Sequence, residues 1–374
     1  MKIIPCFALH FIACTKTAIS FHLRSSSLYT TNTAGRSPVR MSTSATSDSS
    51  IAVVPGRPSW QQTMLRIRNP EKSIKFYTDN FGMTLLDKFD FPKYSFTLYF
   101  LTTLPEGEEY NLKPGTQEAH EYLWSMDGVA LELTYNYDPQ QNYHPGNQER
   151  DGFGHIAFNV EDVYDATDRL LKAGIEFKKK PDEGRMKGLA FAYDPDGYWV
   201  EIVQRPSGII KNYFNLSQTM IRVKDPKKSL AFYRSLGMKL VRERHYGDFS
   251  NYFLASSSSS IPETLDPGSE EANHLVKSMF HPILELTHNH GTEKDESFQH
   301  YNGNEEGRQG FGHIGFLVDD VYKACDAIRS HGYGFRKEPD GGSMKGLAFA
   351  YDPDGYSVEI IKRGGIDFGD LKVT

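Results

Sequence analysis

The chain has little cysteine, no surplus of positive charge and, beyond its first residues, no long apolar run. Only three cysteines occur among 374 residues, and two of them, Cys6 and Cys14, lie near the start. Cys325 is left alone in the body of the chain, so no disulfide framework can form. The formal net charge is −6, with acids and bases interspersed. No basic stripe tracks a phosphate backbone, and we predict no nucleic acid as a partner.

Acidic residues are missing from the first 47 residues, where Lys and Arg are spread among Ser and Thr. This composition is typical of a targeting presequence, so we exclude residues 1–50 from the fold. Within it, TAISF at Thr17 to Phe21 resembles the junction of bipartite plastid presequences. We therefore predict a plastid location, with a mitochondrial presequence or a cytosolic form starting at Met41 as alternatives. No later run is long enough to span a bilayer, and we predict no membrane contact for the mature chain.

The rest of the chain is a tandem duplication. QTMLRIRNPEKSIKFY begins at Gln62 and matches QTMIRVKDPKKSLAFY at Gln218, and MKGLAFAYDPDGY occurs at both Met186 and Met344. Such a repeat predicts two domains, residues 60–206 and 216–364, joined by a short linker. The Gly/Glu-rich segment 105–121 and the serine run 256–260 occupy equivalent places, and both are predicted to be surface loops.

Each repeat contains the same pattern of one strand, one helix and further strands, twice over. Alternating apolar residues predict strands, and an Asn-Pro start or a terminal glycine bounds each helix. In the first repeat we expect strands at 62–67, 96–101, 129–134 and 154–160, helices at 69–82 and 161–174, and two strands joined by an Asp-Pro-Asp-Gly turn within 189–203. The fold class is therefore α+β, with four βαβββ modules.

One potential metal ligand lies on the less apolar face of each of four strands in a repeat, because strand side chains alternate. A single exposed Glu or His normally needs no function. Here, however, one Gln, one His and two Glu recur in the same phases, and this set suits a cation with nitrogen and oxygen ligands. The two sets are Gln62, Glu132, His155 and Glu201, and Gln218, Glu285, His313 and Glu359.

Together, QTMLR, LELTxN, GFGHI, MKGLAF and DPDGYxxEI resemble the motifs of glyoxalase I, the lactoylglutathione lyase family of the vicinal oxygen chelate superfamily. The resemblance covers both repeats and implies two tandem glyoxalase domains. The tandem form is similar to the monomeric two-domain members and implies a monomer. It also implies that the hemithioacetal of methylglyoxal and the co-substrate glutathione is isomerised to S-D-lactoylglutathione, with one divalent metal in each site.

The resemblance further implies that each site is shared between the repeats, as it is shared between the subunits of dimeric members. One site would hold Gln62, Glu132, His313 and Glu359, and the other would hold Gln218, Glu285, His155 and Glu201. Moving a proton between two carbons requires a base and a cation that stabilises the enediolate oxygens. We assign the base to Glu359 and Glu201, opposite Glu132 and Glu285. Zinc is the favoured metal, and nickel and cobalt also suit these ligands.

Glutathione recognition is also carried over from the family. The implied contacts are Arg66, Asn136, Arg222, Asn289, Lys179, Lys337, Met186 and Met344. The lysines have an alternative interpretation as solvated surface charge. The family's arginine before GFGH is replaced by Asp151 and Gln309, with Arg150 and Arg308 one position earlier, where a bulge could restore the contact.

Two other functions fit the same scaffold. A metal-free binding module would not need four ligands in each repeat. An extradiol dioxygenase needs two histidines and a carboxylate at iron, and neither repeat offers a second strand histidine. Within the lyase hypothesis, unequal activity of the two sites is a further alternative, because the loop after Leu133 is shorter than the loop after Leu286.

Overall fold

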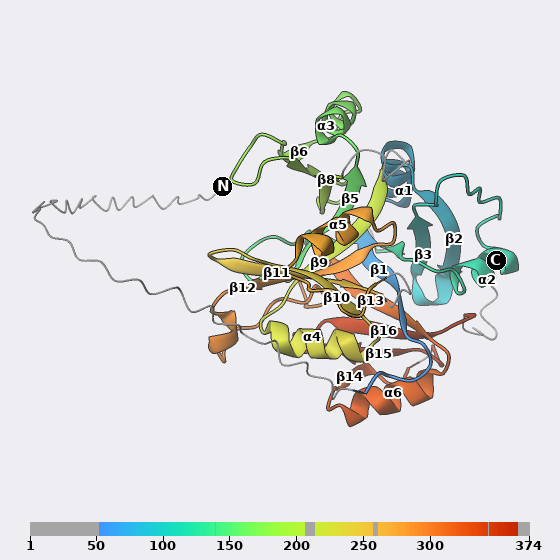
Figure 1. Ribbon diagram of the computed structural model, residues 1–374. Coiled ribbons are helices and arrows are strands. Elements are labelled where there is room, and N and C mark those ends of the chain that lie inside the picture. Colours follow the sequence, from blue (N-terminus) through green and yellow to red (C-terminus); the bar gives the residue numbers. More distant parts are fainter. Residues whose placement is uncertain (1–51, 139, 206–213, 257–260, 343, 366–374) are drawn as a thin grey trace, which may run out of the picture. The chain divides into compact units, whose positions relative to one another are not determined.

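The computed structural model describes residues 52–138, 140–205, 214–256, 261–342 and 344–365 (Figure 1). These residues belong to one unit, Ser49–Thr374. The predicted targeting segment, residues 1–50, and most of the predicted linker lie outside the described residues. Within the described part of the chain, no helix has the length and apolar character needed to cross a membrane.

Two eight-stranded sheets dominate the structure, and each takes half of its strands from each repeat (Figure 1). The first sheet runs in the order β14 (Phe335–Lys337), β15 (Ala348–Tyr351), β16 (Ser357–Lys362), β13 (Phe311–Val318), β1 (Ser59–Ile67), β4 (Ala130–Asn136), β3 (Phe96–Thr102) and β2 (Thr84–Phe91). The second runs in the order β10 (Lys239–His245), β11 (Phe249–Ala255), β12 (Ile283–Asn289), β9 (Asn215–Arg222), β5 (Phe153–Val160), β8 (Trp199–Gln204), β7 (Leu189–Tyr193) and β6 (Phe177–Lys179). The predicted α+β fold of four βαβββ modules is confirmed.

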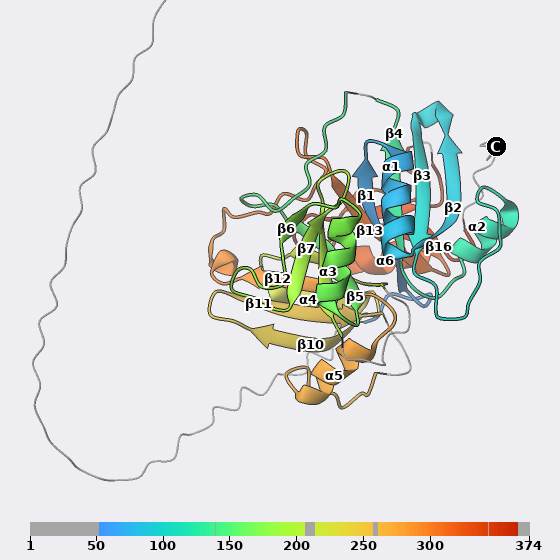
Figure 2. The ribbon, with the colours of Figure 1, turned by 90° about the horizontal axis from the view of Figure 1, so that it is seen from above.

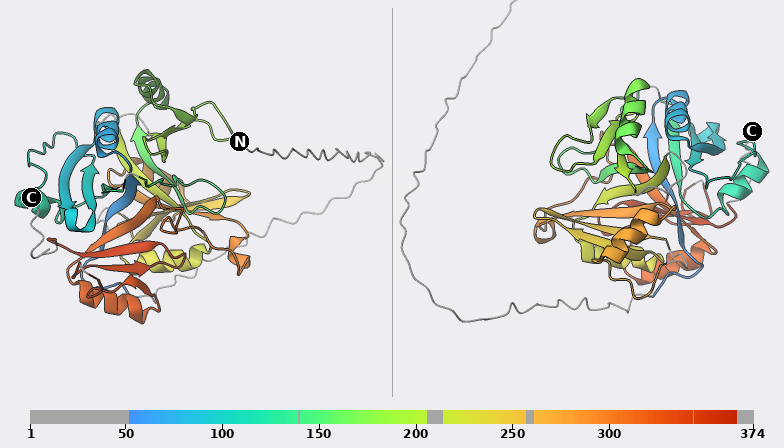
Figure 3. Two further views of the ribbon diagram at one scale, coloured as in Figure 1. Left: turned by 180° about the vertical axis from the view of Figure 1, so that it is seen from behind. Right: turned by 45° about the horizontal axis from the view of Figure 1, so that its top comes forward.

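The centre of each sheet is an antiparallel pair of strands from different repeats. β1 pairs with β13 and β9 pairs with β5, as can be followed in Figure 3. Equivalent residues of the two repeats meet each other there: the Thr63 and Thr219 hydroxyls are 2.8 Å apart, and the rings of Phe153 and Phe311 stack with centroids 5.1 Å apart. Contacts between equivalent residues are the mark of a two-fold interface. The repeats are therefore related as the subunits of a symmetric dimer.

One helix follows the first strand of every module (Figure 2). These helices are α1 (Pro70–Lys75), α3 (Val163–Lys172), α4 (Pro226–Ser235) and α6 (Val321–Ser330). The side chain of Asn69 accepts a hydrogen bond from the Lys72 amide and so caps α1. An aspartate caps each of the other three. The predicted helix 69–82 is not one α-helix, because α1 passes into a π-helical turn, η1 (Phe76–Asn80).

The prediction of a loop over residues 105–121 is wrong at its C-terminal end, where α2 (Gln117–Leu123) begins. The Thr116 hydroxyl accepts from the Ala119 amide and caps this helix. Ser269 caps α5 (Glu270–Ser278) in the second repeat in the same way. Both helices lie between the third and fourth strands of their modules. Their capping residues were the sequence signal, since Thr or Ser precedes acidic residues in each. Two 3₁₀ turns, η2 (Pro92–Tyr94) and η3 (Thr292–Lys294), complete the elements.

The two modules of one repeat are tied by a buried carboxylate in the Asp-Pro-Asp-Gly turn. The Tyr77 hydroxyl donates to Asp194 Oδ2 at 2.8 Å, and Tyr233 donates to Asp352 Oδ2 at 2.9 Å. Burial, assisted by the nearby Asp196, raises the pKa of Asp194 to about 7. Burial also raises the pKa of Asp352. The sheets therefore join modules of different repeats, whereas these turns join modules of the same repeat.

Candidate metal centres and their cavities

Four of the predicted ligands meet on the central strands of the first sheet. We call them the Glu359 cluster: Gln62, Glu132, His313 and Glu359. Gln62 Nε2 lies 2.6 Å from Glu132 Oε2, 2.8 Å from Glu359 Oε2 and 3.1 Å from His313 Nε2. All four side chains are buried. Two come from the first repeat and two from the second, in the combination that the resemblance implied.

The other four predicted ligands meet on the second sheet and form the Glu201 cluster: Gln218, Glu285, His155 and Glu201. Gln218 Nε2 lies 2.8 Å from Glu285 Oε2 and 2.9 Å from Glu201 Oε2. Its distance to His155 Nε2 is 3.5 Å, longer than in the Glu359 cluster. The structure thus brings all eight predicted side chains into two groups, and each group draws on both repeats.

Strand register sets these positions. Gln62 lies opposite Gly315 across the β1–β13 pair, and Gln218 lies opposite Ala157 across the β9–β5 pair. A Cβ atom at Gly315 would stand 2.6 Å from Gln62 Cγ, which is too close for carbon atoms. Glycine therefore lets Gln62 approach the cluster. Ala157 already carries that methyl group, and Gln218 lies farther from its histidine than Gln62 does.

The negative charge of each cluster is partly offset by its histidine. Burial of the ring lowers the pKa of His313, but Glu359 and Glu132 outweigh that effect and raise it to about 9. Burial acts on His155 in the same way, and Glu201 and Glu285 raise its pKa to about 9. An imidazolium between two carboxylates occupies the place that a cation would take. Binding a cation would therefore release this proton.

The two glutamates of a cluster are held differently. Glu132 accepts Thr134 Oγ1 at Oε1 (3.0 Å) and Gln62 Nε2 at Oε2. Glu285 is likewise fixed at both oxygens, with Asn251 Nδ2 2.6 Å from its Oε1. By contrast, the described contacts of Glu359 and Glu201 are all made through Oε2. One carboxylate in each cluster is thus clamped, and the other is attached at a single oxygen.

The donor set fits a divalent cation. In each cluster the histidine nitrogen and the carboxylate oxygens lie within 4.8 Å of one another. Gln62 Oε1 is buried without a hydrogen-bond partner, and a half-turn of the amide would point it at the cluster. Oxygen and nitrogen donors without thiolate suit zinc, nickel or cobalt. Each cluster holds a single histidine among the described residues, which does not match the dioxygenase ligand set.

A cavity opens beside each cluster. The Glu359 cavity has a volume of about 420 Å³ and the Glu201 cavity about 400 Å³, both within the range of small-molecule sites. Most of the predicted glutathione residues line them. Arg66, Asn136, Lys337 and Met344 line the Glu359 cavity, and Arg222, Asn289 and Met186 line the Glu201 cavity.

The two lining arginines also hold the opposite repeat. Arg66 Nη2 donates to Asn304 Oδ1 at 2.8 Å, and Arg222 Nη2 donates to Asn147 Oδ1 at 2.9 Å. Burial lowers the pKa of both guanidinium groups. Sequence reasoning missed the two asparagines. Their positions seven and eight residues before GHI in the two repeats were the only available signal.

Three predicted contacts lie elsewhere. Lys179 is half-buried rather than solvated and donates to the Leu189 carbonyl oxygen at 2.6 Å, without lining the Glu201 cavity. Arg150 donates to the Gln299 carbonyl oxygen and lies over Phe298. Arg308 pairs with Asp151 at 3.1 Å. Both arginines are turned to contacts between the repeats, so neither lines a cavity.

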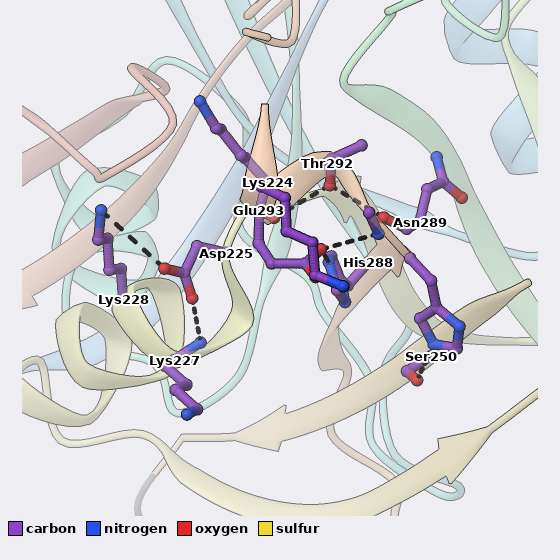
Figure 4. Close-up of polar contacts among 12 residues, drawn as sticks. Lys224, Asp225, Lys227, Lys228, Ser250, His288, Asn289, Thr292 and Glu293 are labelled. Atoms are coloured by element: carbon purple, nitrogen blue, oxygen red, sulfur yellow. Dashed lines mark hydrogen bonds and ion pairs between the residues drawn. The ribbon is translucent and has the colours of Figure 1, made fainter. Parts of the chain in front are cut away.

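The loop after β12 positions Asn289, as Figure 4 shows. The Thr292 hydroxyl donates to the carbonyl oxygens of Asn289 (2.9 Å) and Lys224 (3.0 Å). His288 Nε2 lies 2.9 Å from Glu293 Oε2. Backbone hydrogen bonds, together with His288, lower the pKa of Glu293 to about 2. The longer loop of the second repeat is therefore an ordered set of hydrogen bonds beside its cavity.

Fold and site together define the class of protein. The model of the Glyoxalase/Bleomycin resistance protein/Dioxygenase superfamily matches residues 60–202 and 215–360. The chain therefore belongs to this superfamily, and both of its repeats carry the domain.

Individual relatives identify the family to which the chain belongs within this superfamily. It is 40% identical over 312 residues to the lactoylglutathione lyase of Schizosaccharomyces pombe, covering 80% of this chain and 95% of that protein. It is 41% identical over 320 residues to glyoxalase I of Saccharomyces cerevisiae, covering 81% and 91%. The crystal structure of glyoxalase I from Zea mays is 27% identical, with a TM-score of 0.58, and covers 82% of this chain and 92% of that one. The chain is a member of the glyoxalase I family, the lactoylglutathione lyases.

Proposed function

We propose that this chain is a metal-dependent lactoylglutathione lyase with two active sites, each completed by both repeats. The substrate is the hemithioacetal of methylglyoxal and glutathione, and the product is S-D-lactoylglutathione. The assembly of the eight predicted ligands into two cross-repeat clusters is the observation that carries this proposal. The names of the fungal relatives support the reaction.

The Glu359 and Glu201 clusters would each hold one divalent cation, with zinc favoured and nickel or cobalt as alternatives. When bound, the cation supplies positive charge beside the two substrate oxygens on which negative charge develops. The remaining chemistry is a proton transfer. The hydrogen on C1 moves to C2, and the hydroxyl proton moves from the C1 oxygen to the C2 oxygen, so the atoms balance without a redox cofactor.

The base in this transfer is the glutamate attached at a single oxygen. Glu359 and Glu201 each leave Oε1 without a described contact, so a small rotation can bring a carboxylate oxygen to C1 and then to C2. Glu132 and Glu285 are fixed at both oxygens and hold the opposite side of the site. Burial of all four excludes bulk water from the carbon acid.

Glutathione would be oriented by the arginine and asparagine that line each cavity. Arg66 and Arg222 use part of their five donors on the opposite repeat and keep others for a carboxylate. Asn136 and Asn289 lie at the ends of β4 and β12, on the same side as the clusters. Because one chain completes both sites, we propose that it acts as a monomer.

Metal removal tests the proposal. The full chain is assayed for S-lactoylglutathione formation before chelation, after chelation, and after addition of Zn²⁺, Ni²⁺ or Co²⁺. We expect chelation to abolish activity and at least one of these ions to restore it. Full activity in protein whose metal content has been measured as zero would refute the proposed mechanism.

A further inference from the structure

The two cavities differ in the wall that faces the cluster. In the Glu359 cavity, Phe89 on β2 pairs with Leu98 on β3, and Trp124 follows α2. In the Glu201 cavity the corresponding pair is Arg244 on β10 and Asn251 on β11. Lys277, on α5, stands as far beyond its capping residue as Trp124 does. Three apolar positions of one wall are thus cationic or polar in the other, whereas Tyr246, Phe249 and Phe253 keep an aromatic part of the wall in the Glu201 cavity.

The inner end of the Glu201 cavity is also polar. Arg205 is 4% exposed, and its guanidinium donates to the Met279 carbonyl oxygen. Asn159 is 4% exposed, and its Nδ2 has no hydrogen-bond partner. Both side chains line the cavity. A buried donor without a partner costs free energy, so Asn159 Nδ2 indicates a missing acceptor.

The equivalent positions in the first sheet contain no such groups. Leu317 stands where Asn159 stands, four residues after the cluster histidine, and packs in the apolar core. Arg363 stands where Arg205 stands, four residues after the cluster glutamate, but it bonds to Asp319 and Ser59. The inner end of the Glu359 cavity is therefore filled by hydrocarbon, and its arginine already has a counter-ion.

Several cations that line the Glu201 cavity have no ion-pair partner in the described part of the chain. Among the residues that the structure describes, no carboxylate forms an ion pair with Arg205, Arg242 or Lys277. Burial alone lowers the pKa of Arg205 to about 9. Burial lowers the pKa of Arg242 as well, with a further contribution from Arg244. An anion placed among these side chains would offset both the burial and the mutual repulsion.

Glutathione does not account for these groups. The Glu359 cavity has a further cation of its own in Arg336. The implied glutathione contacts, an arginine and an asparagine, are present in both cavities, whereas Arg205, Arg244 and Lys277 line only the Glu201 cavity. We therefore assign these Glu201-cavity cations to the part of the substrate that varies. That part is the acyl group contributed by the 2-oxoaldehyde. Asn159 and Arg205 lie two side-chain rows along their strands from His155 and Glu201, a distance of about 13 Å. Such a spacing suits the end of an extended acyl chain.

We propose that the Glu201 cavity selects 2-oxoaldehydes whose chain ends in a carboxylate, which Arg205, Asn159 and Lys277 hold at its inner end. The Glu359 cavity, lined by Phe89, Leu98 and Trp124, takes apolar or aromatic acyl groups. This inference rests on the proposed function, because it assigns the acyl end of the same substrate.

Two matched thioethers test this selection without turnover. S-hexylglutathione and S-(5-carboxypentyl)glutathione differ only in a terminal methyl or carboxylate, and their binding to the zinc-loaded full chain is measured by calorimetry. We expect the carboxylated compound to bind one site at least tenfold more tightly than the other, and the hexyl compound to reverse that order. Lys277→Met and Arg205→Met should each remove at least tenfold of the tight carboxylate affinity and change hexyl binding less than threefold. The exposed Lys172→Met is the matched control.

The possible outcomes distinguish the proposed selectivity of the cavities from the proposed isomerase activity. Equal preference of both sites for the carboxylated compound, with no effect of Lys277→Met, would overturn the selectivity while leaving the isomerase intact. Because Lys277 is half-exposed, its variant remains informative if Arg205→Met fails to fold. Site-selective carboxylate binding in a chain that does not isomerise the methylglyoxal hemithioacetal would overturn the proposed function alone. Failure of both compounds to bind would overturn both.

Discussion

The Glu359 and Glu201 sites are built from the same four residue types on equivalent strands, yet their surroundings have diverged. The ligand distances agree closely, apart from two contacts of the histidine. Its distance to the glutamine is 3.1 Å in one site and 3.5 Å in the other. Its distance to the clamped glutamate is 3.2 Å in one site and 3.7 Å in the other. The walls differ at several positions, and at one of them Trp124 faces one cavity and Lys277 the other.

Topology explains why one part is constant and the other is not. The ligands lie on β1, β4, β13 and β16 and on their counterparts, where each strand is paired on both sides. A change there disturbs both repeats. The walls come from β2, β3 and α2 in one sheet and from β10, β11 and α5 in the other, and each set serves a single site. Duplication therefore left the wall of each site free to vary independently.

The largest expected effect comes from removing both bases. Glu201→Gln with Glu359→Gln should lower kcat by about 10²–10⁴-fold, the usual contribution of general-base catalysis. Each single variant should keep the activity of the untouched site, so the two residual activities report the share of each site. The assay is S-lactoylglutathione formation, and Glu263→Gln, an exposed carboxylate, is the control. Wild-type activity in the double variant would remove these glutamates from the mechanism.

Asp194 and Asp352 occupy equivalent positions outside the two sites, and both should make stability depend on pH in the same direction. Because burial raises the pKa of Asp194 to about 7, the folded chain holds this proton more tightly than the unfolded chain does. Its stabilising effect is complete below about pH 4 and is lost as the pH rises through 7, a change of about 2–3 kcal/mol between pH 5 and pH 8.5.

Asp194→Asn, which mimics the protonated acid, should remove that part of the pH dependence, and Asp352→Asn should act in the same direction. Urea unfolding of the metal-free chain at about pH 5 and pH 8.5 measures this pH dependence. The histidines titrate equally in the wild-type chain and in the variant, so they do not contribute to the difference. Exposed Asp168→Asn should retain the wild-type slope. An Asp194→Asn variant with an unchanged slope would show that this carboxyl is ionised in the fold.

A smaller effect should come from exchanging the residues opposite the two glutamines. Gly315→Ala adds a methyl group 2.6 Å from Gln62 Cγ and should weaken zinc binding at the Glu359 site by about tenfold. Ala157→Gly removes the matching methyl group and should strengthen binding at the Glu201 site by a smaller factor. Zinc titration of each variant measures both changes. Unaltered affinity in both variants would mean that the longer contact at Gln218 has another cause.

The sequence predicted the ligands better than it predicted the walls. Alternation along QTMLRI and GHIAFNV places Gln62 and His155 on the open faces of their strands, and the duplication made the pattern convincing. The pairing of Gln62 with His313 came instead from resemblance to a family, because nothing local states which repeat completes a site. Lys277 was missed because its role depends on α5, a helix that lies beyond the predicted serine loop and was not predicted. Arg150 was placed near glutathione from its distance to GFGH alone, whereas its contact with Gln299 depends on the opposite repeat.

The most direct test that each site is shared between the repeats is the zinc content of two double variants, each of which lacks two ligand side chains. Glu132→Ala with His313→Ala damages only the Glu359 cluster, so this chain should retain one zinc ion. Glu132→Ala with His155→Ala damages both clusters and should retain none. The reverse result, no zinc in the first pair and one ion in the second, would show that each repeat forms its own site and would contradict the account.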